Sequence, residues 1–178
     1  SLVGSEMCIR DRSTSFLATD NNITTAVEAW LADRTSAAIT YGNIYYWDVS
    51  QVTDMSYLFY ETDFGSDSND DISAWDVSSV TDMSYMFRQS AFNQPLNTWD
   101  VSSVTTMRAM FYGAVSFNQA LDGWDVSSVT NMRSMFYYAT VFNQPDIIIW
   151  DVSSVTNMSY MFTGSGMASL AGNNAEST

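Results

Sequence analysis

Carboxylates are the side chains of this sequence whose type and spacing could do chemistry. The 178 residues include 20 acidic and 6 basic side chains, which gives a net charge of −14. Several carboxylates that converge on one point form the oxygen cage that calcium requires. One polar stretch, residues 61–71, could supply such a cage, although its spacing does not match an EF-hand loop. Its candidate ligands for a calcium-dependent binding module are Glu61, Asp63, Asp67, Asp70 and Asp71, and the alternative is a solvated acidic loop.

The residue types of the chain exclude most catalytic mechanisms. The chain contains no histidine, which excludes Ser-His and Cys-His catalysis and every histidine-based metal site. Paired carboxylates can hydrolyse glycosides, but no asymmetric acid–base pair stands out among them. We therefore expect a protein that is not an enzyme and assign no catalytic residue, with a glycan-active enzyme as the disfavoured alternative. Apart from calcium, no cofactor is expected.

The charge balance also excludes two classes of partner. Binding to nucleic acid or to an anionic membrane surface needs a basic face, and the acidic surplus argues against both. No apolar run approaches the roughly 18 residues that a membrane-spanning helix needs. We expect no nucleic-acid partner and no membrane insertion in this segment.

A repeated phrase dominates the chain. It begins at Trp47 as WDVSQVTDM and returns four times in nearly the same form, for example as WDVSSVTNM at Trp124. Self-similarity at a period of 20–50 residues is typical of repeat architectures. Because a large aromatic side chain at a fixed place in each copy favours burial between copies, we interpret the repeated tryptophans as the structural core: Trp47, Trp75, Trp99, Trp124 and Trp150.

The spacing inside each copy predicts the local structure. Trp99 and Val101 are two residues apart and share one face of a strand, as a period of two requires. Val104, Met107 and Met110 then step by three, which favours a short helix. We therefore predict an α/β solenoid of leucine-rich-repeat-like coils of about 25 residues. Each coil would contain a short parallel strand and a short helix, and a helix would cap the N-terminal end.

Two rows of residues are the candidate contact surfaces. The first is a ladder of equivalent aspartates beside the tryptophans, namely Asp48, Asp76, Asp100, Asp125 and Asp151. Each can form an Asx-turn to the serine two residues on, or the ladder can recognise a cationic partner. The second row consists of tyrosines beside the predicted helices, and tyrosine is a good contact residue on a rigid surface. Its candidate binding aromatics are Tyr57, Tyr85, Tyr112, Tyr137 and Tyr160.

The chain divides into four segments. Residues 1–12, which contain the single cysteine Cys8, resemble the translation of a transposon-end sequencing adapter and are interpreted as an assembly scar. Residues 13–40 carry apolar side chains at helical spacing and are expected to form the N-terminal capping helix region. Residues 41–166 are the five-coil repeat solenoid, and residues 167–178 are a C-terminal tail or linker.

The string W-D-V-S-x-V-T-x-M-x-x-M-F, followed by F-N-Q, resembles the BspA-type leucine-rich-repeat surface proteins. That group includes the mycoplasma lipoprotein repeats of unknown function, the DUF285-like repeats. The resemblance implies a non-enzymatic, surface-exposed repeat module that mediates protein–protein contact or adhesion to a cell surface. It also implies a location at the cell surface or outside the cell, with an extracellular protein or cell surface as partner.

Ice binding is a further alternative, but regular threonine rows would be expected where this chain repeats Asp and Ser.

Overall fold

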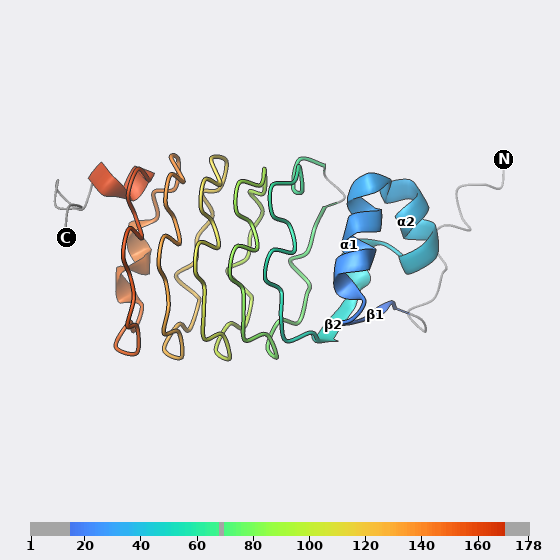
Figure 1. Ribbon diagram of the computed structural model, residues 1–178, viewed down its shortest axis with the longest axis horizontal. Coiled ribbons are helices and arrows are strands. Elements are labelled where there is room, and N and C mark those ends of the chain that lie inside the picture. The colour runs from blue at the N-terminus through green and yellow to red at the C-terminus, as the bar shows by residue number, and fades with distance from the viewer. Residues whose placement is uncertain (1–14, 68–69, 170–178) are drawn as a thin grey trace.

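The computed structural model describes residues 15–67 and 70–169. Its two α-helices and its two-stranded sheet lie together at the N-terminal end, and the repeats extend from them to the other end (Figure 1). In chain order the elements are β1 (Leu17–Thr19), α1 (Ile23–Ala32), α2 (Arg34–Tyr41), η1 (Ile44–Tyr46), β2 (Asp48–Gln51), η2 (Pro145–Ile149) and η3 (Gly166–Ser169), where η denotes a 3₁₀-helix. Strands β1 and β2 pair in parallel as a two-stranded sheet.

The two α-helices follow from capping and amphipathic spacing. Ile23, Val27 and Trp30 recur at helical spacing in α1, and all three are buried. Asp33 caps α2, because its carboxylate accepts the amide hydrogens of Thr35 and Ser36. At the far end of α2, Gly42 takes a positive φ of 77°, which favours glycine and ends the helix.

Successive repeats lie on one another. Isolated parallel bridges join equivalent residues from each repeat to the next, running through Asp54, Asp82, Thr106, Asn131 and Asn157. Buried phenylalanines stack along the same direction, with ring centroids 5.5 Å apart for Phe87 and Phe111 and again for Phe111 and Phe136. The core is therefore a continuous column of aromatic and aliphatic side chains.

The indoles are buried and hydrogen-bonded between repeats. Trp47 and Trp75 stack at 6.3 Å between ring centroids, and Trp124 and Trp150 at 6.4 Å. Each of the last four indole N–H groups donates to a carbonyl of the preceding repeat, three residues before that repeat's tryptophan. The acceptors for Trp75, Trp99, Trp124 and Trp150 are Ile44, Ile72, Leu96 and Leu121, at 2.8, 3.2, 2.9 and 3.0 Å. The amphipathic indole is thus both buried and satisfied.

The prediction of an α/β solenoid with a strand and a helix in each coil is wrong. In the described part of the chain there are two α-helices and one two-stranded parallel sheet, and both lie before or at the first repeat. Tight turns occupy the predicted strands. In the third repeat the amide of Val104 donates to the carbonyl of Val101, and the amide of Ser102 donates to the side chain of Asp100. The first repeat makes the same two bonds and still forms strand β2, because it pairs with β1. The later repeats lack such a pairing over these residues and are joined there only by isolated bridges further along the phrase.

Left-handed residues replace the predicted short helices. Tyr85 and Gln89 have φ values of 62° and 54°, which an α-helix does not allow. The amides of Met83, Tyr85, Phe87 and Gln89 donate to the next repeat, to the carbonyls of Thr106, Arg108, Met110 and Tyr112. The intervening amides of Met86 and Arg88 close turns on Met83 and Tyr85. Each repeat thus gives alternate amides to its neighbour, where a helix would use all of them internally.

The segment boundaries predicted from the sequence are not settled by these elements. The interpretation of residues 1–12 as a scar, with Cys8, lies outside the described residues. The same is true of the predicted tail from residue 170 onward. The divisions at residues 40 and 166 stay predictions.

Candidate functional site

A row of tyrosines and arginines lies on the outside of the turn segments. The buried phenylalanines Phe59, Phe87, Phe111 and Phe136 are each directly followed by a tyrosine or arginine that is only half-buried. We call this row the tyrosine–arginine strip, and its members are Tyr57, Tyr60, Tyr85, Arg88, Arg108, Tyr112, Arg133, Tyr137, Tyr138 and Tyr160. It contains all five tyrosines that the sequence predicted as binding aromatics. Among them Tyr57 and Tyr160 are 53% and 55% exposed, so more than half of each side chain is free for contact.

The backbone positions these tyrosines by an unusual conformation. Tyr57, Tyr85 and Tyr160 occupy equivalent places and have φ values of 60°, 62° and 61°. A non-glycine residue in the left-handed region costs roughly 1–2 kcal/mol. At Tyr57 and Tyr85 an inter-repeat bond of the same residue offsets that cost, since their amides donate to the carbonyls of Ser84 and Arg108 at 3.0 and 2.9 Å. The rings are therefore held on a rigid support.

The rings and guanidinium groups of the strip pack on one another. Tyr57 stacks on Tyr85 at 4.6 Å between centroids, and Tyr112 stacks on Tyr137 at 4.8 Å. Arg88 lies between the two stacked pairs, with its Cζ 5.8 Å from the ring of Tyr85 and 4.7 Å from that of Tyr112. Two more guanidinium groups lie over rings of the strip, Arg108 over Tyr85 and Arg133 over Tyr160. Cation–π contacts of this kind order both partners.

No arginine of the strip forms an ion pair within the described residues, where the ion pairs to an arginine all involve Arg34. Glu61 lies beside Arg88, since its amide donates to the carbonyl of Arg88, but its carboxylate is hydrogen-bonded to the hydroxyl of Tyr60. The Nε of Arg88 is buried and has no hydrogen-bond partner in the same part of the chain. Planar guanidinium groups bind carboxylate or sulfate groups in two-point contacts, so the strip can bind an anionic group between aromatic faces.

Two tyrosines of the strip have raised pKa values. A hydrogen bond to Glu61 raises the pKa of the Tyr60 hydroxyl above its ordinary value. Desolvation, followed by the nearby Tyr138 and Tyr112, raises the pKa of Tyr137. Both hydroxyls stay protonated at neutral pH and remain hydrogen-bond donors.

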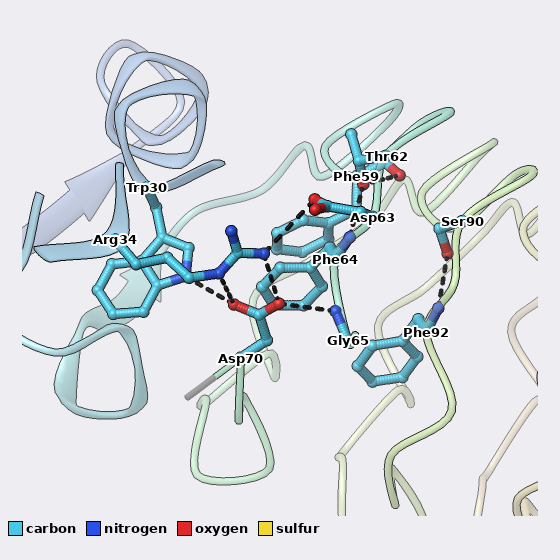
Figure 2. A network of polar contacts seen from close by, with 10 residues as sticks. All are labelled: Trp30, Arg34, Phe59, Thr62, Asp63, Phe64, Gly65, Asp70, Ser90 and Phe92. Atoms are coloured by element: carbon cyan, nitrogen blue, oxygen red, sulfur yellow. Dashed lines mark hydrogen bonds and ion pairs between the residues drawn. The ribbon is translucent and has the colours of Figure 1, made fainter. Parts of the chain in front are cut away.

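The acidic stretch 61–71 is built around one buried carboxylate (Figure 2). Asp70 is fully buried and accepts from Nε and Nη2 of Arg34, each at 2.8 Å. It also accepts from the indole of Trp30 and from the amide of Gly65, each at 2.9 Å. Burial raises the pKa of Asp70, but these hydrogen bonds outweigh burial and hold it below its usual range. Asp70 therefore joins the helical end to the first long loop.

The other predicted calcium ligands are not gathered around Asp70. Asp63 lies 3.5 Å from Nη2 of Arg34, and Asp71 accepts the amide of Ser73. Glu61 and Asp67 complete the predicted set, and Glu61 is exposed. In residues 15–67 and 70–169, no three acidic, cysteine or histidine side chains are grouped so that they could hold a metal ion. Calcium binding stays a prediction from the sequence.

The aspartate ladder forms the Asx-turns that its spacing suggested. The amides of Ser50, Ser78, Ser102, Ser127 and Ser153 donate to Asp48, Asp76, Asp100, Asp125 and Asp151 respectively. The serine hydroxyls lower the pKa values of Asp100, Asp125 and Asp151 by hydrogen bonding. All five aspartates are exposed, and recognition of a cationic partner by them stays a prediction.

Sequence reasoning missed the arginines of the strip and the partner of Asp70. A signal for the arginines was present, because Arg108 and Arg133 directly follow the core residues Met107 and Met132. Both arginines are exposed and therefore join the tyrosine row. Nothing in the sequence pattern connected Arg34 with Asp70, which lie 36 residues apart.

Comparison with known proteins yields one family. A family described as "Mycoplasma protein of unknown function, DUF285" matches residues 25–144 and 89–173. No curated protein and no solved structure is detectably similar to the chain. In the part of the chain that the structure describes, every helix is too short or too polar to cross a membrane.

Proposed function

Since this chain belongs to the DUF285 family of Mycoplasma proteins of unknown function, we propose its function from its own surface: a non-enzymatic module that binds a protein partner through the tyrosine–arginine strip. The observation that carries the proposal is the placement of Arg88 between two stacked tyrosine pairs, where it forms no ion pair within the described residues. Tyrosine and arginine are enriched among the residues that dominate binding energy at protein interfaces. The strip presents both types side by side.

Rigidity supports this proposal. Binding loses affinity when side chains must be ordered at the interface, at about 0.5–1.5 kcal/mol for each rotamer-rich side chain. In the strip, Tyr57 and Tyr85 already stack on one another, and Arg88 already lies over the ring of Tyr112. A partner would therefore meet a surface whose contact groups are ordered in advance.

Charge indicates the chemistry of the partner. The chain carries a net charge of −14, yet Arg88, Arg108 and Arg133 are concentrated in one strip. A partner segment that carries carboxylates next to apolar or aromatic groups would complement it. An extended acidic partner would meet repulsion elsewhere on the surface, so the acidic segment is expected to be short.

The location belongs to the proposal as well. The W-D-V-S-x-V-T-x-M phrase resembles the BspA-type surface proteins, and that resemblance supports display at the cell surface or outside the cell. Adhesion to an extracellular protein or to another cell is the role that fits this location. The full gene would test the location, because a signal peptide upstream or an anchor downstream would support it.

The binding experiment compares strip variants with a matched tyrosine outside the strip. Wild-type chain, Tyr85→Ser/Tyr112→Ser and Arg88→Gln are applied to a panel of immobilised extracellular-matrix proteins and fixed epithelial cells. Tyr46→Ser is the control, since Tyr46 is 65% exposed and lies outside the strip. We expect saturable binding to at least one panel member, at least tenfold weaker for the strip variants and unchanged for Tyr46→Ser. No saturable binding, or equal binding by all variants, would contradict the proposal.

A further inference from the structure

The two ends of the repeat stack are built differently. At the N-terminal end the groups that would meet a preceding repeat have substitutes. The indole of Trp47 donates to the carbonyl of Gly42 at 3.1 Å, in place of a repeat carbonyl. The carboxylate of Asp20 accepts from the amide and the hydroxyl of Thr53, at 2.8 and 2.7 Å. In later repeats a threonine carbonyl has that role, as Thr81 does for Thr105. The end of α2 and the residue that follows β1 thus complete this end.

The C-terminal end has no such substitutes in the described residues. In the fourth repeat the amides of Met132, Ser134, Phe136 and Tyr138 donate to carbonyls of the fifth. The equivalent amides of the fifth repeat belong to Met158, Tyr160, Phe162 and Gly164, and within residues 15–67 and 70–169 they meet no acceptor. The carbonyl of Thr156 likewise accepts no bond there, although its counterpart on Thr130 accepts from both the amide and the hydroxyl of Thr156.

Apolar side chains that are buried in earlier repeats are exposed to solvent at the C-terminal end of the stack. Met158 is 40% exposed, whereas its counterpart Met132 is 0% exposed, and Val152 is 37% exposed against 1% for Val126. Together they line a hollow of about 360 Å³. Ile147, Trp150, Met161 and Phe162 also line it. We call this hollow and the four amides the terminal face.

We propose that the terminal face binds one further repeat of the same W-D-V-S-x-V-T-x-M-x-x-M-F type. The interface between the fourth and fifth repeats continues into it, with the same amides, the same apolar stripe and the same spacing. The indole of the added repeat donates to the carbonyl of Ile147, as the indole of Trp150 donates to Leu121. Its turn segment supplies the carbonyls for Met158, Tyr160, Phe162 and Gly164, and its threonine donates to the carbonyl of Thr156.

Other occupants match this face less well. A second copy that met it face to face would place amide donors against amide donors, which cannot pair. A head-to-tail copy would have to displace α1, whose Ile23, Val27 and Trp30 are buried. Residues 170–178, LAGNNAEST, contain one large apolar side chain and cannot reproduce the stripe of a repeat. A repeat offers both the apolar stripe and the row of carbonyls.

The test adds the proposed occupant to the full chain. A second copy of residues 138–163 is inserted between Thr163 and Gly164, which keeps the period because Tyr138 and Gly164 occupy equivalent left-handed positions. Amide hydrogen exchange is measured for Met158, Tyr160 and Phe162. The control insertion has the copies of Trp150, Met158, Met161 and Phe162 replaced by serine. A third sample is the chain shortened after residue 169.

We expect exchange at Met158, Tyr160 and Phe162 to slow at least 100-fold in the extended chain, toward the rates of Met132, Ser134 and Phe136. The control insertion should keep the rates of the original chain. Unchanged rates in the extended chain, or a lower thermal midpoint than that of the original chain, would overturn the proposal. Faster exchange after shortening would identify residues 170–178 as the occupant. A dimer of the original chain in sedimentation equilibrium, abolished by Met158→Gln, would identify a second copy. Either result would also overturn the proposal.

Discussion

The indole nitrogen of Trp124 donates to the carbonyl of Leu96 at 2.9 Å, across the boundary between two repeats. The amide of Trp99 donates to the same carbonyl, at 3.0 Å. One oxygen thus joins a turn within its own repeat to the core of the next. The pairing explains why the phrase keeps its tryptophan and the apolar residue three positions earlier at constant spacing.

Replacement of a central indole should destabilise the stack. Trp99 is buried, and burying such a side chain removes about 150–250 Å² from water. We expect Trp99→Ala to lower the free energy of unfolding by about 3–5 kcal/mol in chemical denaturation. Trp99→Phe should cost less, since the carbonyl of Ile72 still accepts the amide of Trp75. The exposed Tyr46→Ala serves as control and should change stability by less than about 0.5 kcal/mol. An unmoved midpoint for Trp99→Ala would contradict stacking.

The buried pair of Arg34 and Asp70 should make the helical end sensitive to acid. The pKa of Asp70 is lowered in the folded state, so its contribution is complete above the unfolded value of about 3.9 and is lost as the pH falls through the folded value. We expect Asp70→Asn to cost about 3 kcal/mol at pH 7, because it removes the buried counter-charge of Arg34 and leaves only the exposed Asp63 nearby. The variant should also show a flatter dependence of stability on pH between about pH 5 and pH 2.

The matched control for that prediction is Asp63→Asn. Asp63 lies 3.5 Å from the same guanidinium group, but its side chain is 68% exposed. Its loss should cost less than about 1 kcal/mol. Equal pH profiles for wild type and Asp70→Asn, measured by denaturation at several pH values, would show that Asp70 is not the group that titrates.

Because Gly113 has a left-handed backbone conformation, the residue that replaces it should determine how much stability is lost. Gly113 has a φ of 62°, and a Cβ added there would lie 3.0 Å from Cγ of Gln89. We expect Gly113→Val to destabilise by about 2 kcal/mol and Gly113→Asn by about half as much, because asparagine tolerates the left-handed region. Thermal unfolding of the two variants is the measurement. A helix at this place would give the opposite result, since glycine costs about 1 kcal/mol in a helix interior.

Asp20 should stabilise the first member of a row of equivalent threonines, one in each repeat. The row consists of Thr53, Thr81, Thr105, Thr130 and Thr156. Its carboxylate accepts from the amide and hydroxyl of Thr53 and from the amide of Asp54. We expect Asp20→Ala to lower stability by about 1–2 kcal/mol and to speed amide exchange at Thr53 and Asp54. Exchange at Thr105 and Thr130 should stay unchanged, because their acceptors are repeat carbonyls. Equal acceleration along the whole row would contradict a local cap.

The sequence predicted what is buried better than how the backbone runs. The tryptophan phrase identified the buried residues, since identical side chains at a constant spacing must meet identical neighbours. The period of three through Val104, Met107 and Met110 suggested a helix, because apolar spacing alone does not distinguish a helix from a run of turns. Non-glycine residues in the left-handed region, such as Ala109 and Ser134, carry no turn signal in their residue type. Their conformation is imposed by bonds to the next repeat.

The candidate site was predictable only where it depends on local sequence patterns. The spacing places the tyrosines outside the core stripe, and the structure leaves them exposed or half-buried. The contacts of Arg88 with rings of different repeats depend on packing in space, which no local pattern shows. The ion pair of Arg34 with Asp70 joins residues far apart in sequence, so no local pattern announces it. The aspartate ladder was predictable because an Asx-turn is local, as in Asp125 and Ser127.

Alternate amides of each turn segment bond to the next repeat, as those of Met83, Tyr85, Phe87 and Gln89 do. Through-hydrogen-bond couplings in NMR, recorded on a chain labelled with ¹⁵N and ¹³C, measure this directly. The account predicts a coupling from the amide nitrogen of Phe87 to the carbonyl carbon of Met110, and from that of Phe111 to Met135. A coupling from Phe87 to the carbonyl of Met83, four residues earlier, would indicate a helix within the repeat and would contradict the account.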